Sequence, residues 1–165
     1  AFFFSLLTFL ALFKVEAGFV KFIGTVVSSS LGVGFLLLPF ALIMVGVLLI
    51  ICRGKPIKGR VIATLLIPYL VGAVAHAFVG TTDLSFGAMA ESGKTLCGGG
   101  ILAGYPAALL VSSISRIATV ILFVAATLFV ILTAFDLTIM TVYDSLKSFF
   151  TGLHYEVEYE EEDEE

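Results

Sequence analysis

Charged residues are scarce in this sequence. Only 13% of its 165 residues are Asp, Glu, Lys or Arg, about half of the roughly 25% found in an average soluble domain. Hydrophobic residues make up 59% of the chain and the mean hydropathy is +1.13, which excludes a water-soluble globular domain. The same composition excludes intrinsic disorder everywhere except the extreme C-terminus. Two cysteines are too few for a disulfide-dense secreted fold.

The acidic residues are concentrated at the C-terminus, where eight of the thirteen lie within 156–165. Such a run repels itself and stays solvated. With only Val157 and Tyr159 as apolar positions, it cannot bury a core. We therefore predict a transmembrane domain over 1–153 and the start of a disordered acidic linker over 154–165. A specific acidic docking motif is the alternative for the linker.

Long stretches without charge predict the membrane spans. The clearest is Val33–Cys52, with Leu, Ile, Phe or Val at 14 of its 20 positions, followed by Val61–Val79 and Ile117–Phe135. Ala1–Phe13 is also apolar, but it reaches only about 20 Å, short of a hydrocarbon core of about 30 Å. No basic segment precedes it and no small-residue cleavage site follows it, as a signal peptide would need. We read it as a fourth span whose first turns are missing, in a chain that is a fragment of a longer protein.

The fold class that follows is all-α: a polytopic membrane protein with four transmembrane helices and short interfacial helices. Two segments, Val15–Ser30 and Thr138–Phe150, have apolar residues on one helical face and polar residues on the other, which predicts interfacial helices. Ile101–Ser115 contains Pro106 and three serines, and it is too short and polar for a full span. We expect it to be a half-inserted or interfacial helix.

The orientation follows from a basic loop between the second and third spans. Arg53, Lys55, Lys58 and Arg60 fall within eight positions that contain no acidic residue. A short loop with such an excess of basic residues is typical of the cytoplasmic side. Alternation then places both chain ends in the cytoplasm and residues 14–31 and 81–116 outside.

Two glycine-rich motifs resemble nucleotide-binding signatures without meeting their requirements. Gly93-Lys94-Thr95 has the end of a phosphate-binding loop, but Ala88 occupies the position where that loop needs its first glycine. Gly98-Gly99-Gly100 followed by Gly104 lacks both the preceding strand and the acidic ribose ligand of a dinucleotide site.

The second motif is better explained by helix packing. Gly100, Gly104 and Ala108 recur every fourth residue, which gives one helix face without large side chains. Such faces let helices approach closely in lipid. The three consecutive glycines would supply a flexible connection leading into this helix.

Candidates for chemistry are few. His76 is the one ionisable group inside a predicted span. Intramembrane ionisable groups are often functional, but a neutral histidine that is hydrogen-bonded near a helix end is the commoner case. Cys52 and Cys97 are predicted on opposite sides of the membrane, so they can neither pair nor share a metal. The sequence therefore predicts no catalytic residues, no metal site and no cofactor, and it argues against an enzyme.

The order of these features resembles the N-terminal four-helix membrane domain of the FtsK/SpoIIIE family of bacterial DNA translocases. The similarity runs from about Phe2 to Leu146. It rests on Gly18-Phe19-Val20-Lys21-Phe22-Ile23-Gly24, on Gly32, on Leu37-Leu38-Pro39-Phe40 with Gly46, on the basic loop 53–60, and on Gly98-Gly99-Gly100-Ile101-Leu102-Ala103-Gly104. All of these are patterns of hydrophobic and small residues, and their order and spacing carry the match.

The resemblance implies a membrane anchor in the bacterial inner membrane. It would tether a cytoplasmic, hexameric, ATP-driven DNA pump at the division septum during chromosome segregation. The motor would follow residue 165, so DNA and ATP would be partners of that domain only. The partners expected for these residues are the lipid bilayer, further copies of the chain and division-site membrane proteins. The alternative is a small transporter or channel-like subunit that uses His76 with helices broken at Pro39 and Pro68.

The predicted orientation can be tested with the two native cysteines. Cys97 should react with a membrane-impermeant thiol reagent added to intact cells, whereas Cys52 should react only after the membrane is permeabilised. The measurement is the mass shift of the labelled protein before and after permeabilisation. Labelling of Cys52 but not Cys97 in intact cells would reverse the orientation.

Overall fold

The described part of the chain is helical throughout. The computed structural model describes residues 1–13, 18–52, 57–80 and 82–135, and no β-strand occurs in these ranges. This confirms the all-α class for the described residues, while the predicted helix Thr138–Phe150 and the acidic linker 154–165 lie outside them. The helices are α1 (Phe2–Leu12), α2 (Gly18–Leu31), the 3-10 helix η1 (Gly32–Leu36), α3 (Leu38–Ile51), α4 (Lys58–Val79), α5 (Phe86–Lys94), α6 (Gly100–Ser113) and α7 (Arg116–Ala134).

Three helical segments within these ranges are long and apolar enough to cross a membrane: Gly18–Leu36, Lys58–Val79 and Arg116–Ala134. Lys58–Val79 contains the span predicted at 61–79, and Arg116–Ala134 covers all but the last residue of the span predicted at 117–135. With 22 and 19 residues, they extend about 33 and 28 Å, close to the thickness of a hydrocarbon core. Four membrane-spanning helices remain a prediction.

The prediction of one continuous helix over Val33–Cys52 is wrong. Gly32 has φ +54 and ends α2, η1 follows, and α3 begins only at Leu38. Pro39 stands in the first turn of α3, where its missing N–H costs no hydrogen bond. The interfacial helix predicted at 15–30 is also longer than expected, because α2 and η1 together form the apolar segment Gly18–Leu36.

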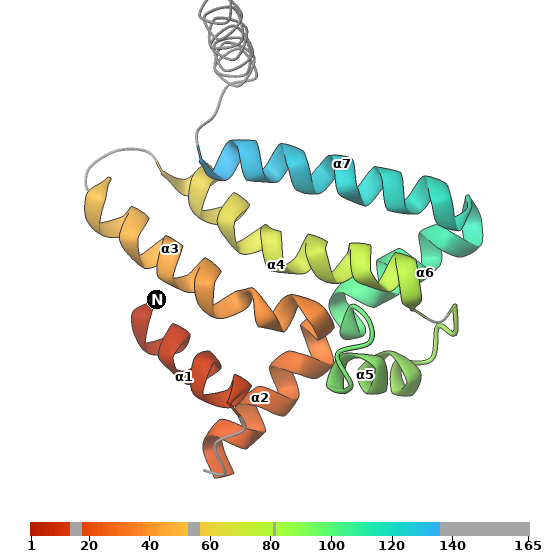
Figure 1. The fold of residues 1–165 in the computed structure, drawn as a ribbon, viewed down its shortest axis with the longest axis horizontal. Coiled ribbons are helices and arrows are strands. Elements are labelled where there is room, and N and C mark those ends of the chain that lie inside the picture. Colours follow the sequence, from red (N-terminus) through yellow and green to blue (C-terminus); the bar gives the residue numbers. More distant parts are fainter. Residues whose placement is uncertain (14–17, 53–56, 81, 136–165) are drawn as a thin grey trace, which may run out of the picture.

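The ends of the long helices lie on two opposite sides of the molecule (Figure 1). α3, α4 and α7 lie side by side with alternating direction, and α1 packs against α3. Ala1, the end of α3, the start of α4 and the end of α7 lie on one side of the molecule. The end of α4, the start of α7 and α5 lie on the other side.

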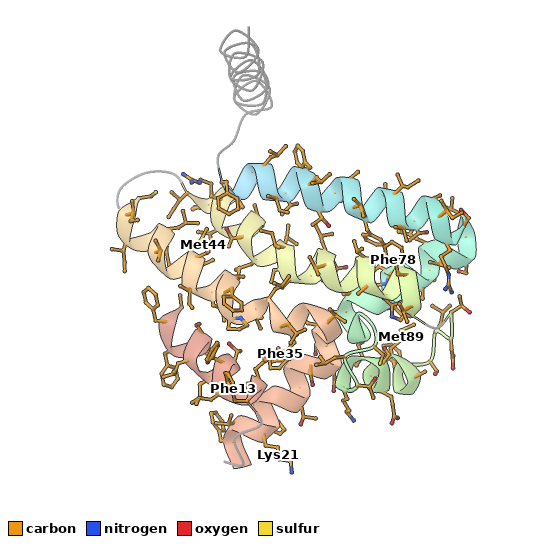
Figure 2. The ribbon with its side chains drawn as sticks, viewed as in Figure 1. Phe13, Lys21, Phe35, Met44, Phe78 and Met89 are labelled. Carbon is orange, nitrogen blue, oxygen red and sulfur yellow. The ribbon has the colours of Figure 1, made fainter. Side chains whose placement is uncertain are left out.

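Small residues occupy the interior and large ones the surface. Eight of the fifteen buried hydrophobic residues are alanine. Of the fourteen phenylalanines in the described ranges, twelve are exposed and only Phe35 and Phe123 are buried. Phe35 is 4% exposed, whereas Phe13 and Phe78, also labelled in Figure 2, are 69% and 58% exposed. Soluble proteins bury large apolar side chains, so this distribution fits an apolar surrounding in which small residues mediate helix contact.

Arginine side chains join α4 and α7 at both of their ends. Arg60 Nε, in the first turn of α4, donates to the carbonyl oxygen of Ala134 at the end of α7, at 3.3 Å. At the opposite end, Arg116 Nη1 in the first turn of α7 donates to the carbonyl oxygen of Phe78, at 3.2 Å. The last carbonyls of a helix lack intrahelical partners and carry partial negative charge, which a guanidinium group complements.

Replacing Arg116 should therefore loosen the α4–α7 pair. Arg116→Met should lower stability in detergent by about 1 kcal/mol, the value of a typical net hydrogen bond. The measurement is the midpoint of thermal unfolding in one detergent. Lys94→Met removes an exposed cation from the end of α5 and serves as the control. Equal midpoints for the two variants would mean that the Arg116 contact adds nothing.

Candidate functional site

α5 and α6 form an antiparallel helical hairpin. The ring of Phe86, at the start of α5, stacks on that of Tyr105 in α6, with centroids 6.0 Å apart and planes 4° apart. At the other end of the pair, a Cβ added to Gly93 would lie 2.9 Å from the Cα of Gly100. The turn between the helices therefore lies at the end of the hairpin opposite Phe86.

The turn of this hairpin packs against α4 well inside the molecule. A Cβ on Gly99 would lie 2.7 Å from the carbonyl oxygen of Gly72, and a Cβ on Gly72 would lie 3.2 Å from the Cβ of Ala103. Gly72 precedes Val79, the last residue of α4, by seven residues, or about 10 Å along the helix. The hairpin thus enters the bundle from the Val79 end and reaches about a third of the length of α4.

At this position several glycines pack closely against neighbouring atoms, mostly of the backbone. We name this cluster the glycine junction. A Cβ added to any of them would lie within about 3 Å of a neighbouring backbone or buried side-chain atom, closer than packed atoms tolerate. Their partners come from α2, η1, α4, α5 and α6. The members of the glycine junction are Gly32, Gly72, Gly93, Gly98, Gly99, Gly100 and Gly104.

Two members of the junction also need glycine for their backbone conformation. Gly32 has φ +54 and Gly100 has φ +66, in the left-handed region that other residues enter at a cost. A Cβ on Gly32 would collide with the carbonyl oxygen of Gly98. The next amide along, that of Val33, donates to the same oxygen at 2.9 Å. The end of α2 is therefore fixed to the hairpin turn by backbone contacts.

His76 lies beside the glycine junction, in the last turn of α4. It is 2% exposed, and its Nδ1 accepts a hydrogen bond from the Gly99 amide at 3.3 Å. A Cβ on Gly104 would lie 3.0 Å from that nitrogen and 3.1 Å from the sulfur of Met89, which is fully buried (Figure 2). An Nδ1 that accepts a hydrogen bond carries no proton, so this contact requires neutral imidazole. The arrangement is that of a histidine used in packing.

The predicted small face lies within the interior. Gly100, Gly104 and Ala108 are all buried in α6, and the three consecutive glycines 98–100 are buried as well. These glycines make tight contacts with α2, η1 and α4, where the sequence had led us to expect a loose connection. Ala103 and Ala107 widen the same face and belong to the hydrophobic core.

Sequence reasoning missed the partners of that face. Gly32, Gly72 and Gly93 were not predicted to meet it, although all three lie at the junction. A visible signal was that α2–η1, α4 and α5 each contain glycine near their ends. The spacing of the sixteen glycines along the sequence does not indicate which of them pack together in the fold.

The Gly-Lys-Thr motif does not form a phosphate-binding loop. Gly93 and Lys94 are the last two residues of α5, and Thr95 follows as its C-cap. A phosphate-binding loop needs this motif at the start of a helix, where free amides point at the phosphate. Gly93 is instead buried against the carbonyl oxygens of Ser28 and Ser29.

Of the remaining predicted residues, Cys97 directly precedes Gly98 of the junction, and the others that the structure describes lie apart from it. Lys58 and Arg60 lie in the first turn of α4, at the opposite end from His76, and Arg53 and Lys55 lie outside the described residues. Cys52 follows α3, Cys97 follows α5, and both are free thiols. Among the described residues, no group of three or more His, Cys, Asp or Glu could hold a metal ion.

The junction brings together one imidazole, a thioether, backbone amides and carbonyls. The Ser92 hydroxyl, also beside Gly98, donates to the carbonyl oxygen of Met89 at 2.8 Å. Most of the close contacts join glycines to backbone atoms, so the geometry suits close packing of helices. Comparisons with family models, with curated proteins and with solved structures find no match to the chain.

A larger side chain in the junction should separate the helices. Gly104→Leu places a branched side chain against His76 and Met89, so the free energy of unfolding in detergent should fall by about 1–3 kcal/mol, the usual cost of overpacking. The yield should fall as well. Gly87→Leu is the matched control, because a Cβ at Gly87 meets nothing within 4 Å. Parental stability of Gly104→Leu would show that α6 does not need this close approach.

Proposed function

We propose that this chain is a membrane anchor domain. The observation that carries the proposal is the distribution of side chains: twelve phenylalanines are exposed, while alanine and glycine fill the helix contacts. Such a surface has a lower free energy in contact with lipid than in contact with water. Of the three helices of adequate length and hydropathy, α4 and α7 would supply two of the four predicted spans. α1 and α3 would supply the other two, with Gly18–Leu36 as the segment predicted to be interfacial.

The proposed location is the bacterial inner membrane, with both ends of the domain in the cytoplasm. Lys58 and Arg60 at the start of α4 support this orientation, together with Arg53 and Lys55 in the preceding sequence. Arg60 and Arg116 stand at opposite ends of the α4–α7 pair. In this orientation they would mark the two edges of the hydrocarbon core, where long basic side chains reach the headgroups.

The buried polar side chains support an anchor over a transporter. The hydroxyls of Thr64 and Thr119 bond carbonyls four residues earlier in their own helices, at 2.8 and 2.7 Å. The Ser5 hydroxyl bonds the carbonyl of Pro39 at 2.9 Å and joins α1 to α3. The two threonine hydroxyls are thus satisfied within their own helices and the Ser5 hydroxyl joins two helices, whereas a transport path needs polar groups that face a substrate.

The activity of the tethered partner follows from the resemblance alone. In the FtsK/SpoIIIE family, a hexameric ATP-driven DNA pump would follow this domain and move chromosomal DNA at the division septum. In this proposal, residues 1–153 perform no catalysis and bind no cofactor. DNA and ATP bind the motor, and the acidic residues 154–165 begin the linker that leads to it.

A small transporter or channel-like subunit is the second candidate. Two features favour it: the helix broken between η1 and α3, and the α5–α6 hairpin that turns inside the bundle. Transporters and channels build substrate sites from such interrupted helices. His76, beside the hairpin turn, would then be the group that handles protons or substrate.

Two experiments separate these functions. Reading the native gene beyond the codon for Glu165 should reveal a P-loop ATPase domain, and a stop codon soon after that position would overturn the anchor proposal. Purified protein in liposomes should give no flux above that of empty vesicles for protons or K⁺. Flux that His76→Gln abolishes would establish the transporter instead.

The anchor role can be measured in the full-length protein with a fluorescent tag. Replacing residues 1–135 by an unrelated four-span segment should delocalise it from the septum and leave chromosomes trapped there, because the spans position the motor. Scrambling 156–165 at constant composition is the control and should leave septal fluorescence unchanged. If the scrambled variant delocalises equally, residues 156–165 act as a recognition element and the linker interpretation is wrong.

A further inference from the structure

One face of α4 is covered along only half of its length. Residues 62, 66, 69, 73 and 76 follow one another at helical spacing and share this face. Ile62 and Leu66 are 58% and 39% exposed, whereas Ala73 and His76 are 0% and 2% exposed. The α5–α6 hairpin covers the buried half through its contacts with Gly72 and His76. We name the uncovered half, formed by Ile62, Leu65, Leu66 and Tyr69, the open face of α4.

Tyr69 lies at the boundary between the two halves. It is half-buried, and its ring packs against the core that includes Leu70 and Ala107. It is the twelfth of the 22 residues of α4, about 15 Å from either end. No residue in the described ranges hydrogen-bonds its hydroxyl, and at this depth of a membrane no water is available to do so.

The open face therefore differs from the exposed apolar surface of α7. Ile117, Ile121 and Phe129 are more than 60% exposed there, but the hydroxyls of Thr127 and Thr133 bond carbonyls of their own helix at 2.7 and 2.9 Å. Lipid tails can cover the α7 surface, because its threonine hydroxyls are already hydrogen-bonded. They offer no hydrogen-bond partner to the phenol of Tyr69.

We propose that the open face of α4 is the contact between two copies of this chain. Copies in one membrane share one orientation, so a two-fold axis between them runs along the membrane normal and residues at equal depth meet. Tyr69 then meets Tyr69 of the second copy. A hydroxyl both donates and accepts, so the two phenols satisfy one another. Ile62 and Leu66 pack against the same residues of the second copy.

This inference rests on the proposed membrane orientation and names a partner for the anchor domain. The test uses the full chain in cell membranes, with Cys52→Ser and Cys97→Ser as the background. Leu66→Cys should give a cross-linked dimer with a short bismaleimide, since it lies on the open face one turn from Tyr69. Ile121→Cys on α7 is the matched control, because it is 64% exposed but lies on the face assigned to lipid.

A second variant tests the hydrogen bond itself. Tyr69→Phe in the Leu66→Cys chain should lower the cross-linked fraction roughly three- to tenfold, as expected for losing one hydrogen bond. Tyr105→Phe is the control, because that phenol belongs to the ring stacked on Phe86. An unchanged cross-linked fraction in Tyr69→Phe would overturn the pairing of the two phenols.

Three other outcomes would overturn the dimer. These are absence of the Leu66→Cys product, equal cross-linking of Ile121→Cys, and an adduct whose mass belongs to another protein. Alkaline carbonate extraction of the same membranes distinguishes the causes. A chain that stays in the membrane without cross-linking contradicts only the dimer, whereas a chain released by carbonate contradicts the anchor proposal as well.

Discussion

Four carbonyl groups at the end of α2, those of residues 28–31, face glycines of other helices, and the rest of the structure depends on these contacts. Gly93, Gly100 and Gly72 meet them, each with no room for a Cβ. A side chain at any of the three would push α5, α6 or α4 away from α2. Because these contacts join helices distant in sequence, they define where the hairpin turn lies and how far it enters the bundle.

The same constraint explains why large side chains lie outside. In lipid, burying a phenylalanine between helices gains little over leaving it among acyl chains, so helix association depends on close packing and hydrogen bonding. Alanine and glycine permit that packing, and Ala73, Ala103 and Ala107 form the centre of the core. The hydrogen bond from Ser5 to Pro39 and the two arginine contacts between α4 and α7 are directional contacts between otherwise apolar helix surfaces.

The interrupted helices would have a structural role in the proposed anchor. η1 lets the chain turn from α2 into α3 beside the hairpin, and the Val33 amide bonds the hairpin turn through Gly98. His76 holds the same turn through the Gly99 amide. A domain fastened in this way has little freedom to open alternately to the two sides, which alternating access would require. This rigidity suits a part whose proposed role is to hold a motor in place.

The sequence by itself determined the helices that are long and free of charge enough to be recognised as possible membrane spans. The segments 61–79 and 117–135 could be recognised because 19 uncharged residues match the thickness of a membrane core. The small face of Gly100, Gly104 and Ala108 was visible from its four-residue spacing, since that period depends on local helix geometry. The break between α2 and α3 was not predicted, because an apolar stretch such as 33–52 has the same hydropathy whether or not it is broken.

Only the tertiary structure decided which surfaces meet. The break at Gly32 depends on the carbonyl of Gly98, a residue 66 positions away, and no local pattern encodes that distance. The burial of glycines 98–100 follows from contacts with α2 and α4 in the same way. The open face of α4 could not be predicted either, because Ile62 and Ala73 belong to one apolar stripe and differ only in whether the hairpin reaches them. Hydropathy reports how a segment partitions into lipid, whereas backbone contacts between distant glycines decide how the segments pack.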